Sequence, residues 1–139
     1  LVTILITVAI MIVAVGVMLL VALTRKGSVT TITMTTRRIV LHSAASPDVV
    51  YALLSQECPS GYSVEDVDPF RGLVILSSRP TAFTWGFFYP VVVSAEGTGA
   101  RVEIGIKSKV FQYGPLVTRA HRKLANAVAG LPNVHIKNG

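Results

Sequence analysis

Charged residues are absent from the first 24 positions of this 139-residue chain. Within residues 1–23 the only polar side chains are Thr3 and Thr7. At a rise of 1.5 Å per residue, this run forms a helix of roughly 35 Å, enough to cross a hydrocarbon core of about 30 Å. The missing charge therefore predicts a transmembrane helix over residues 1–24.

The features of a cleaved signal peptide are also missing. No basic residue precedes the apolar run, the run is longer than the usual apolar region, and residues 20–24 make a poor cleavage site. Arg25 and Lys26 follow the run directly, and the positive-inside rule then places the rest of the chain in the cytoplasm. We expect a single-pass protein of the cell (inner) membrane with a cytoplasmic C-terminal domain.

Cysteine is nearly absent, and residues that could form a catalytic or metal site are scattered. A single cysteine, Cys58, excludes an internal disulfide, which fits a reducing compartment. His42, His121 and His135 do not have metal-ligand spacing with one another or with Cys58. There is no glycine-rich phosphate loop. We therefore expect no catalytic site, no metal and no cofactor, and we do not expect an enzyme.

Acidic residues are missing from both ends of the remaining chain. Residues 25–47 carry four basic side chains and no acid, residues 48–104 carry all seven acids, and residues 105–139 carry six basic side chains and no acid. Such asymmetry suits contact with anionic lipid headgroups or an acidic partner. The residues expected on this surface are Arg25, Lys26, Arg119, Arg122 and Lys123. Aromatic residues are not interleaved with them, so we do not expect nucleic acid as a partner.

The residue patterns after the apolar run predict a small α+β domain at residues 31–139. A juxtamembrane linker at residues 25–30 joins this domain to the transmembrane helix. Ser46-Pro47-Asp48 has the residues of a helix start, with a capping serine and a proline at the first helical position. The expected elements are a strand at 31–41, a helix at 47–56, strands at 62–67, 73–78, 83–95 and 101–110, and a helix from 114 to 130. This order, β-α-β-β-β-β-α, predicts an antiparallel sheet with the helices on one face.

The last predicted helix is amphipathic. Its apolar residues recur at helical spacing and form a stripe of Val117, Ala120, Leu124, Ala127, Val128 and Leu131. Arg119, Arg122 and Lys123 lie on the opposite side. One face of this helix is therefore expected in the core and the other on a basic surface.

Five of the chain's aromatic residues gather between positions 83 and 89. On a regular strand they fall on both faces, which is more than a one-sided core needs. They either fill the core or form an apolar patch for a partner or a membrane-interface belt. For the second alternative the surface residues are Trp85, Phe87, Phe88 and Tyr89.

Residues 45–54, at the step from the first strand to the first helix, resemble the helix-grip superfamily, which includes START domains and polyketide-cyclase-like proteins. The glycine turn and alternating strand at residues 97–104, followed by a long C-terminal helix, are also similar to that superfamily. The resemblance covers most of residues 31–131. It implies a curved sheet that grips a helix around an apolar ligand, and it transfers no activity.

Two functions follow as hypotheses. The first is a non-catalytic accessory subunit that clamps its neighbours in a larger membrane complex, for example a respiratory or photosynthetic one. Its helix would then contact other membrane subunits through small and hydroxyl side chains, namely Thr3, Thr7, Ala9, Ala14 and Gly16. The alternative is a membrane-tethered domain of the helix-grip type that binds a lipid or another apolar ligand.

Overall fold

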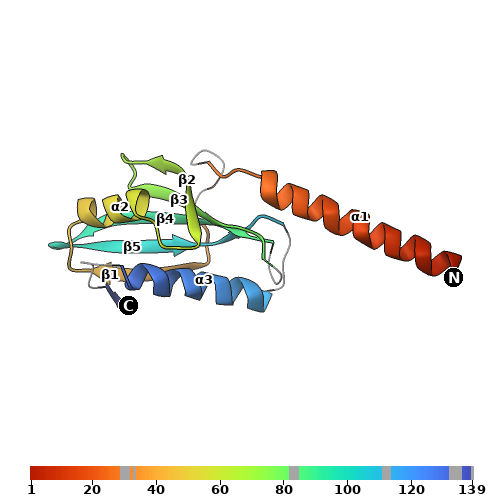
Figure 1. The fold of residues 1–139 in the computed structure, drawn as a ribbon. Coiled ribbons are helices and arrows are strands. Elements are labelled where there is room, and N and C mark those ends of the chain that lie inside the picture. The colour runs from red at the N-terminus through yellow and green to blue at the C-terminus, as the bar shows by residue number, and fades with distance from the viewer. Residues whose placement is uncertain (29–31, 33, 82–84, 111–113, 132–135, 139) are drawn as a thin grey trace.

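The computed structural model describes residues 1–28, 32, 34–81, 85–110 and 114–131, together with the backbone of 136–138. A long helix, α1 (Val2–Thr24), projects from a domain in which a sheet is covered by two shorter helices (Figure 1). Those helices are α2 (Pro47–Gln56) and α3 (Gly114–Ala129). The strands are β1 (Arg38–Ser43), β2 (Tyr62–Asp68), β3 (Leu73–Ser78), β4 (Phe87–Glu96), β5 (Gly99–Gly105), β6 (Lys107–Ser108) and β7 (Ile136–Asn138).

The strands form one antiparallel sheet with the order β2-β3-β4-β5-β1-β7, and β6 pairs with β4. Two hairpins, β2–β3 and β4–β5, form four adjacent strands of this sheet. Asp68 and Arg71 form an ion pair in the β2–β3 turn, and Gly72 adopts a φ of 62° there. Gly97, with a φ of 59°, turns β4 into β5. Strand β1 pairs with β5 along six residues, and β7 pairs with the other side of β1.

Local sequence signals mark the start of α2 and the end of α3. The Ser46 side chain accepts a hydrogen bond from the Val49 N–H, and Pro47 occupies the first turn of α2. Gly130 follows α3 directly, and its N–H bonds the carbonyls of Asn126 and Ala127. The prediction of α2 and α3 on one face of an antiparallel sheet is therefore confirmed.

The main core lies between the sheet and these two helices. On this side β4 contributes the buried residues Phe87, Tyr89, Val91 and Val93, and the helices α2 and α3 contribute Val50, Leu54, Leu124 and Val128. Because side chains alternate along a strand, every second residue of β4 points to the other face.

That other face carries a second apolar cluster, made of Ile32, Leu73, Ile75 and Phe88, with Val92 against it. Part of its cover comes from the segment after α1. A Cβ atom on Gly27 would lie 2.9 Å from Phe88 Cδ1, and Ile32 is 3% exposed. The described part of the predicted linker, residues 25–28, therefore packs against the sheet.

The structure differs from the sequence prediction at several points. The first strand begins at Arg38 rather than at residue 31. The strand predicted at 101–110 is divided into β5 and β6, and β7 was not predicted. Residues 83 and 84 of the predicted aromatic strand lie outside the described residues. Phe87, Phe88 and Tyr89 are each no more than 1% exposed, so the prediction that they form an exposed partner or membrane surface is wrong. The main core buries Phe87 and Tyr89 on one face of the sheet, and the smaller cluster buries Phe88 on the other.

The α1 helix is long and apolar enough to cross a membrane, and none of its most apolar stretch is buried in the domain. Signal sequences share this length and composition. The Thr7 hydroxyl donates a hydrogen bond to the Thr3 carbonyl of the same helix, 2.9 Å away. A contact of Thr3, Thr7, Ala9, Ala14 or Gly16 with another helix remains a prediction.

Candidate binding pocket

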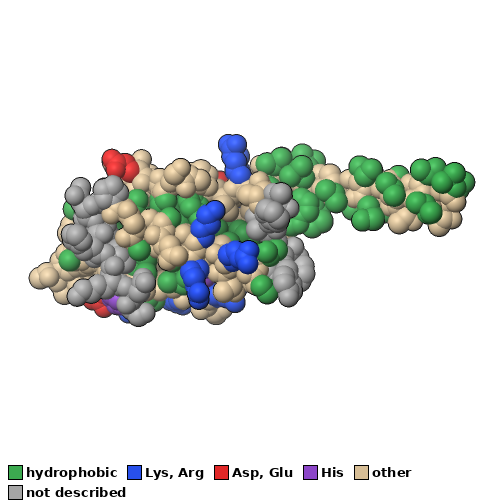
Figure 2. All heavy atoms as spheres, turned by 60° about the horizontal axis from the view of Figure 1, so that its bottom comes forward, with side chains coloured by type: hydrophobic (Ala, Val, Ile, Leu, Met, Phe, Trp, Pro, Cys, Tyr) green, Lys and Arg blue, Asp and Glu red, His purple; other side chains and the backbone are tan. Residues whose placement is uncertain are grey.

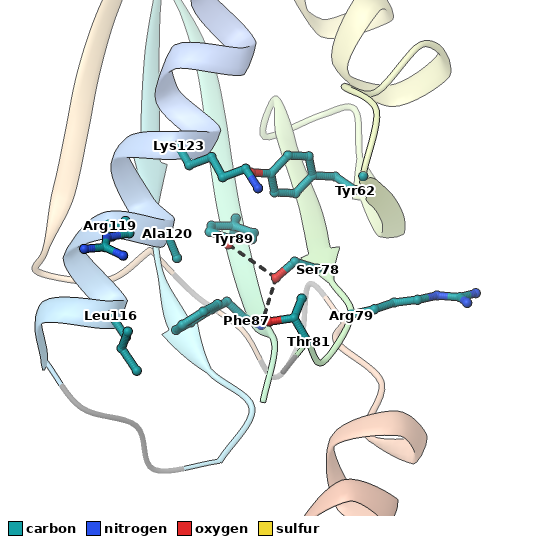
Figure 3. Close-up of a pocket in the computed structure, with 11 residues that line it drawn as sticks. Tyr62, Ser78, Arg79, Thr81, Phe87, Tyr89, Leu116, Arg119, Ala120 and Lys123 are labelled. Atoms are coloured by element: carbon teal, nitrogen blue, oxygen red, sulfur yellow. Dashed lines mark hydrogen bonds between the residues drawn. The ribbon is translucent and has the colours of Figure 1, made fainter. Parts of the chain in front are cut away.

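A pocket of about 300 Å³ lies between α3 and the edge of the sheet formed by β2, β3 and β4 (Figure 3). It is lined by Gly61, Tyr62, Ser78, Arg79, Thr81, Phe87, Tyr89, Leu116, Arg119, Ala120 and Lys123. Leu116 and Ala120 are four residues apart and therefore share one face of α3. The small side chain of Ala120 leaves room where the larger Leu124 fills the core one turn later.

Aromatic rings form the wall contributed by the sheet. The ring of Tyr89 meets that of Tyr62 edge-on at a centroid distance of 5.6 Å, and the ring of Phe87 lies 6.1 Å from that of Tyr89. Such tilted contacts are favourable arrangements for aromatic rings. They hold the wall in place without filling the space toward α3.

A few polar atoms sit among these rings. The Ser78 hydroxyl accepts a hydrogen bond from the Phe87 N–H at 3.2 Å and lies 3.3 Å from the Tyr89 hydroxyl. Burial raises the pKa of Tyr89 strongly, and it also raises the pKa of Tyr62. Both phenols are therefore neutral near pH 7, where they can donate hydrogen bonds to a ligand.

Cationic side chains surround the pocket unequally. In Figure 3 the Lys123 amine points toward the hydroxyl end of Tyr62, across the opening. Arg79 and Arg119 extend away from the pocket, although both contribute to its lining. The arrangement is an apolar cleft with one cation aimed over it, which suits an apolar or amphipathic small molecule.

The predicted basic face of α3 is present. Arg119, Arg122 and Lys123 are exposed, and together with Pro115, Thr118 and Asn126 they line a shallow groove on the outside of α3. Figure 2 shows Lys and Arg side chains gathered on the face that α3 occupies. Arg25 and Lys26 lie elsewhere, at the end of α1, where they line a separate pocket.

Three further residues considered in the sequence analysis, Trp85, His121 and Cys58, are buried or half-buried. Trp85 is half-buried, so its role as a surface contact stays a prediction. His121 is 3% exposed, and its Nε2–H donates to the Ile104 carbonyl of β5, although its sequence neighbours are basic. Cys58 is half-buried against the Tyr62 carbonyl, and burial raises the pKa of its thiol. A raised pKa disfavours the reactive thiolate.

Sequence reasoning missed most of the pocket. Tyr62, Ser78 and Leu116 were assigned no function, and Phe87 and Tyr89 were placed either in the core or on a partner or membrane surface. One signal was available. An alanine in the middle of the apolar stripe of α3, opposite an aromatic strand, marks a place where helix and sheet do not fill the space between them.

Comparison with known proteins supports the fold. No protein-family model and no curated protein matches the chain. Among solved structures, that of Ara h 8.0201 matches with a TM-score of 0.51 and 6% sequence identity, over 66% of this chain and 90% of the other. That protein has the helix-grip fold. The chain thus has a fold of the helix-grip type, as its sequence predicted, and at this identity the likeness shows the fold alone.

Proposed function

We propose that this protein is a membrane-tethered binding domain that takes an apolar or amphipathic ligand, such as a single acyl chain, into the pocket between α3 and the sheet. The observation that carries the proposal is the apolar cleft of about 300 Å³ itself, lined by Phe87, Tyr89, Leu116 and Ala120. Its volume is at the lower end of small-molecule sites, which span about 300–1,000 Å³.

The fold and the position of the cleft support the same proposal. In a helix-grip fold the long C-terminal helix closes a curved sheet, and here the cleft lies beneath the first half of that helix. Leu116 lies in the first turns of α3, at the end of the domain that α1 also leaves (Figure 1). With α1 in a bilayer, the cleft would lie near the membrane surface, where apolar ligands are concentrated.

The accessory-subunit hypothesis receives no comparable support. A cytoplasmic position of the domain also remains a proposal, based on Arg25 and Lys26 directly after α1. Protease added outside intact cells or spheroplasts should leave the domain uncut. Digestion from the outer side alone would contradict this orientation.

The ligand can be tested with the full chain extracted from membranes in a mild detergent. Native mass spectrometry should detect a bound lipid-like molecule, and the Ala120→Phe variant should lose it because the added ring occupies the cleft. Ala129→Phe, on the same helix but outside the lining, is the matched control and should retain the ligand. Thermal unfolding must show that both variants are folded. Equal retention in the two variants, or no ligand in the native chain, would contradict the proposal.

A further inference from the structure

A second, smaller pocket of about 210 Å³ lies where α1 meets the domain. Arg25, Lys26, Ile32, Phe88 and Lys107 line it. Three of these five side chains are cationic, and they come from two parts of the chain that are some eighty residues apart. Arg25 and Lys26 end α1, whereas Lys107 belongs to β6, whose backbone pairs with Phe88.

One basic group of this pocket, the guanidinium of Arg25, is held in place. The Arg25 Nη1 donates a hydrogen bond to the Lys109 carbonyl at 2.5 Å, and its guanidinium carbon lies 5.9 Å from the centre of the Phe88 ring. The Lys109 amine lies 5.1 Å from the same ring. Because one nitrogen of Arg25 is engaged by the backbone, the side chain is fixed while other N–H donors remain for a ligand.

The charge in the pocket is not neutralised by any acidic side chain in the described part of the chain. All seven acidic side chains belong to the described residues. Asp68 pairs with Arg71, Glu96 with His42, and Glu103 with Arg38 and Arg101. Arg25, Lys26 and Lys107 have no ion-pair partner among the described residues. Three like charges around one small pocket repel one another, and a bound anion would relieve that repulsion.

The position of the pocket indicates which anion. A 23-residue helix is roughly 35 Å long, so in a bilayer Arg25 would lie close to the level of the headgroups. Phospholipid phosphates lie at that level, and basic pockets beside membrane helices bind anionic headgroups. Ile32 and Phe88 give the pocket an apolar side next to its cations, as a phosphate attached to a glycerol and acyl chains requires.

We infer that the pocket formed by Arg25, Lys26 and Lys107 over Phe88 binds the phosphate of an anionic phospholipid. The lipid would link the end of α1 to the sheet and so fix how the domain stands on the membrane. This inference requires α1 to lie in a bilayer, and it does not depend on a ligand in the cleft beneath α3.

The test uses the full chain in maltoside micelles, which carry no phosphate, with backbone amide resonances as the readout. Dihexanoyl phosphatidylglycerol should shift the amides of Lys26 and Lys107 saturably, whether or not the Ala120 amide in the other cleft also responds to its acyl chains. Dihexanoyl phosphatidylcholine and inorganic phosphate should bind more weakly. Lys107→Gln removes one exposed charge and should weaken the phosphatidylglycerol affinity about fivefold.

Arg71→Gln is the matched control, since it removes one charge from the β2–β3 turn, at the far end of β3, and should not change the affinity. Equal binding of the two lipids, or an unchanged affinity in Lys107→Gln, would overturn the inference. Inorganic phosphate that binds as tightly as phosphatidylglycerol would overturn the assignment to a lipid. A shift at Ala120 alone would support the proposed ligand cleft and contradict the second site.

Discussion

The guanidinium of Arg25 donates a hydrogen bond to the backbone carbonyl of Lys109, 84 residues further along the chain. This bond joins the end of α1 to the strand region that flanks Phe88, and both residues lie over that ring. The helix is therefore fastened to the domain, and its direction is coupled to that of the sheet. A freely jointed tether would make no such contacts.

The close packing behind this junction can be tested at Gly27. A Cβ there would lie 2.7 Å from Ile32 Cδ1 and 2.9 Å from Phe88 Cδ1. We expect Gly27→Val to lower the free energy of unfolding by about 1–3 kcal/mol because the buried ring must move. Gly114→Val is the control, since a Cβ at Gly114 meets nothing within 4 Å. Chemical denaturation in detergent measures both, and equal stability of the two variants would show that the segment is not packed as described.

The buried His121 predicts a dependence of stability on pH. Burial, and to a smaller extent the charge of Arg37, lower its pKa from the ordinary 6.5, while its bond to the Ile104 carbonyl acts the other way. As the pH falls below 6.5, the unfolded chain binds a proton that the folded chain does not. Stability should therefore fall toward acid, by at most about 1.4 kcal/mol per pH unit for one proton, until the folded pKa is reached.

The variant His121→Gln isolates this contribution, because the other titrating groups, including His42 beside Glu96, remain unchanged. The difference in unfolding free energy between the native chain and the variant should shrink as the pH falls through this range. A difference that stays constant with pH would mean that His121 is not neutral and buried in the folded protein.

The exposed basic face of α3 predicts an electrostatic contact with anionic membranes. Reversing Arg119, Arg122 and Lys123 to Glu should leave the fold intact, since single changes at exposed positions usually cost less than about 0.5 kcal/mol. Energy transfer from Trp85, the only tryptophan, to dansyl-labelled lipids should be higher in anionic than in neutral nanodiscs for the native chain. The triple variant should lose that difference, and high salt should have the same effect. Transfer that is unaffected by the variant and by salt would mean that this face is only solvated.

The elements that could be predicted from the sequence are those specified by residues close together in the chain. The start of α2 at Ser46-Pro47, the hairpins and the amphipathic α3 all depend on turn chemistry or on spacing within a few residues, and these predictions were correct. Spacing also placed His121 three residues before Leu124 and four after Val117, on the apolar stripe, although its basic neighbours concealed this.

What could not be predicted depends on contacts between distant segments. Strand β7 is three residues long and exists because it pairs with β1. The burial of Phe88 requires a cover on the second face of the sheet, and the segment around Gly27 and Ile32 supplies part of it. Neither segment has a periodicity that reveals its partner. The choice between core and surface for the aromatics of β4 was therefore left open, and the cleft that two of them line was not predicted.

The most direct test of the ligand-binding proposal is photocrosslinking of the full chain in membranes that contain a diazirine-bearing fatty acid. Adducts mapped by mass spectrometry should fall on Tyr62, Leu116 and Ala120, in addition to α1, where contact with bulk lipid is expected. The adducts on Tyr62 and Leu116 should disappear in Ala120→Phe and persist in Ala129→Phe. Labelling confined to α1 in the native chain would contradict the account.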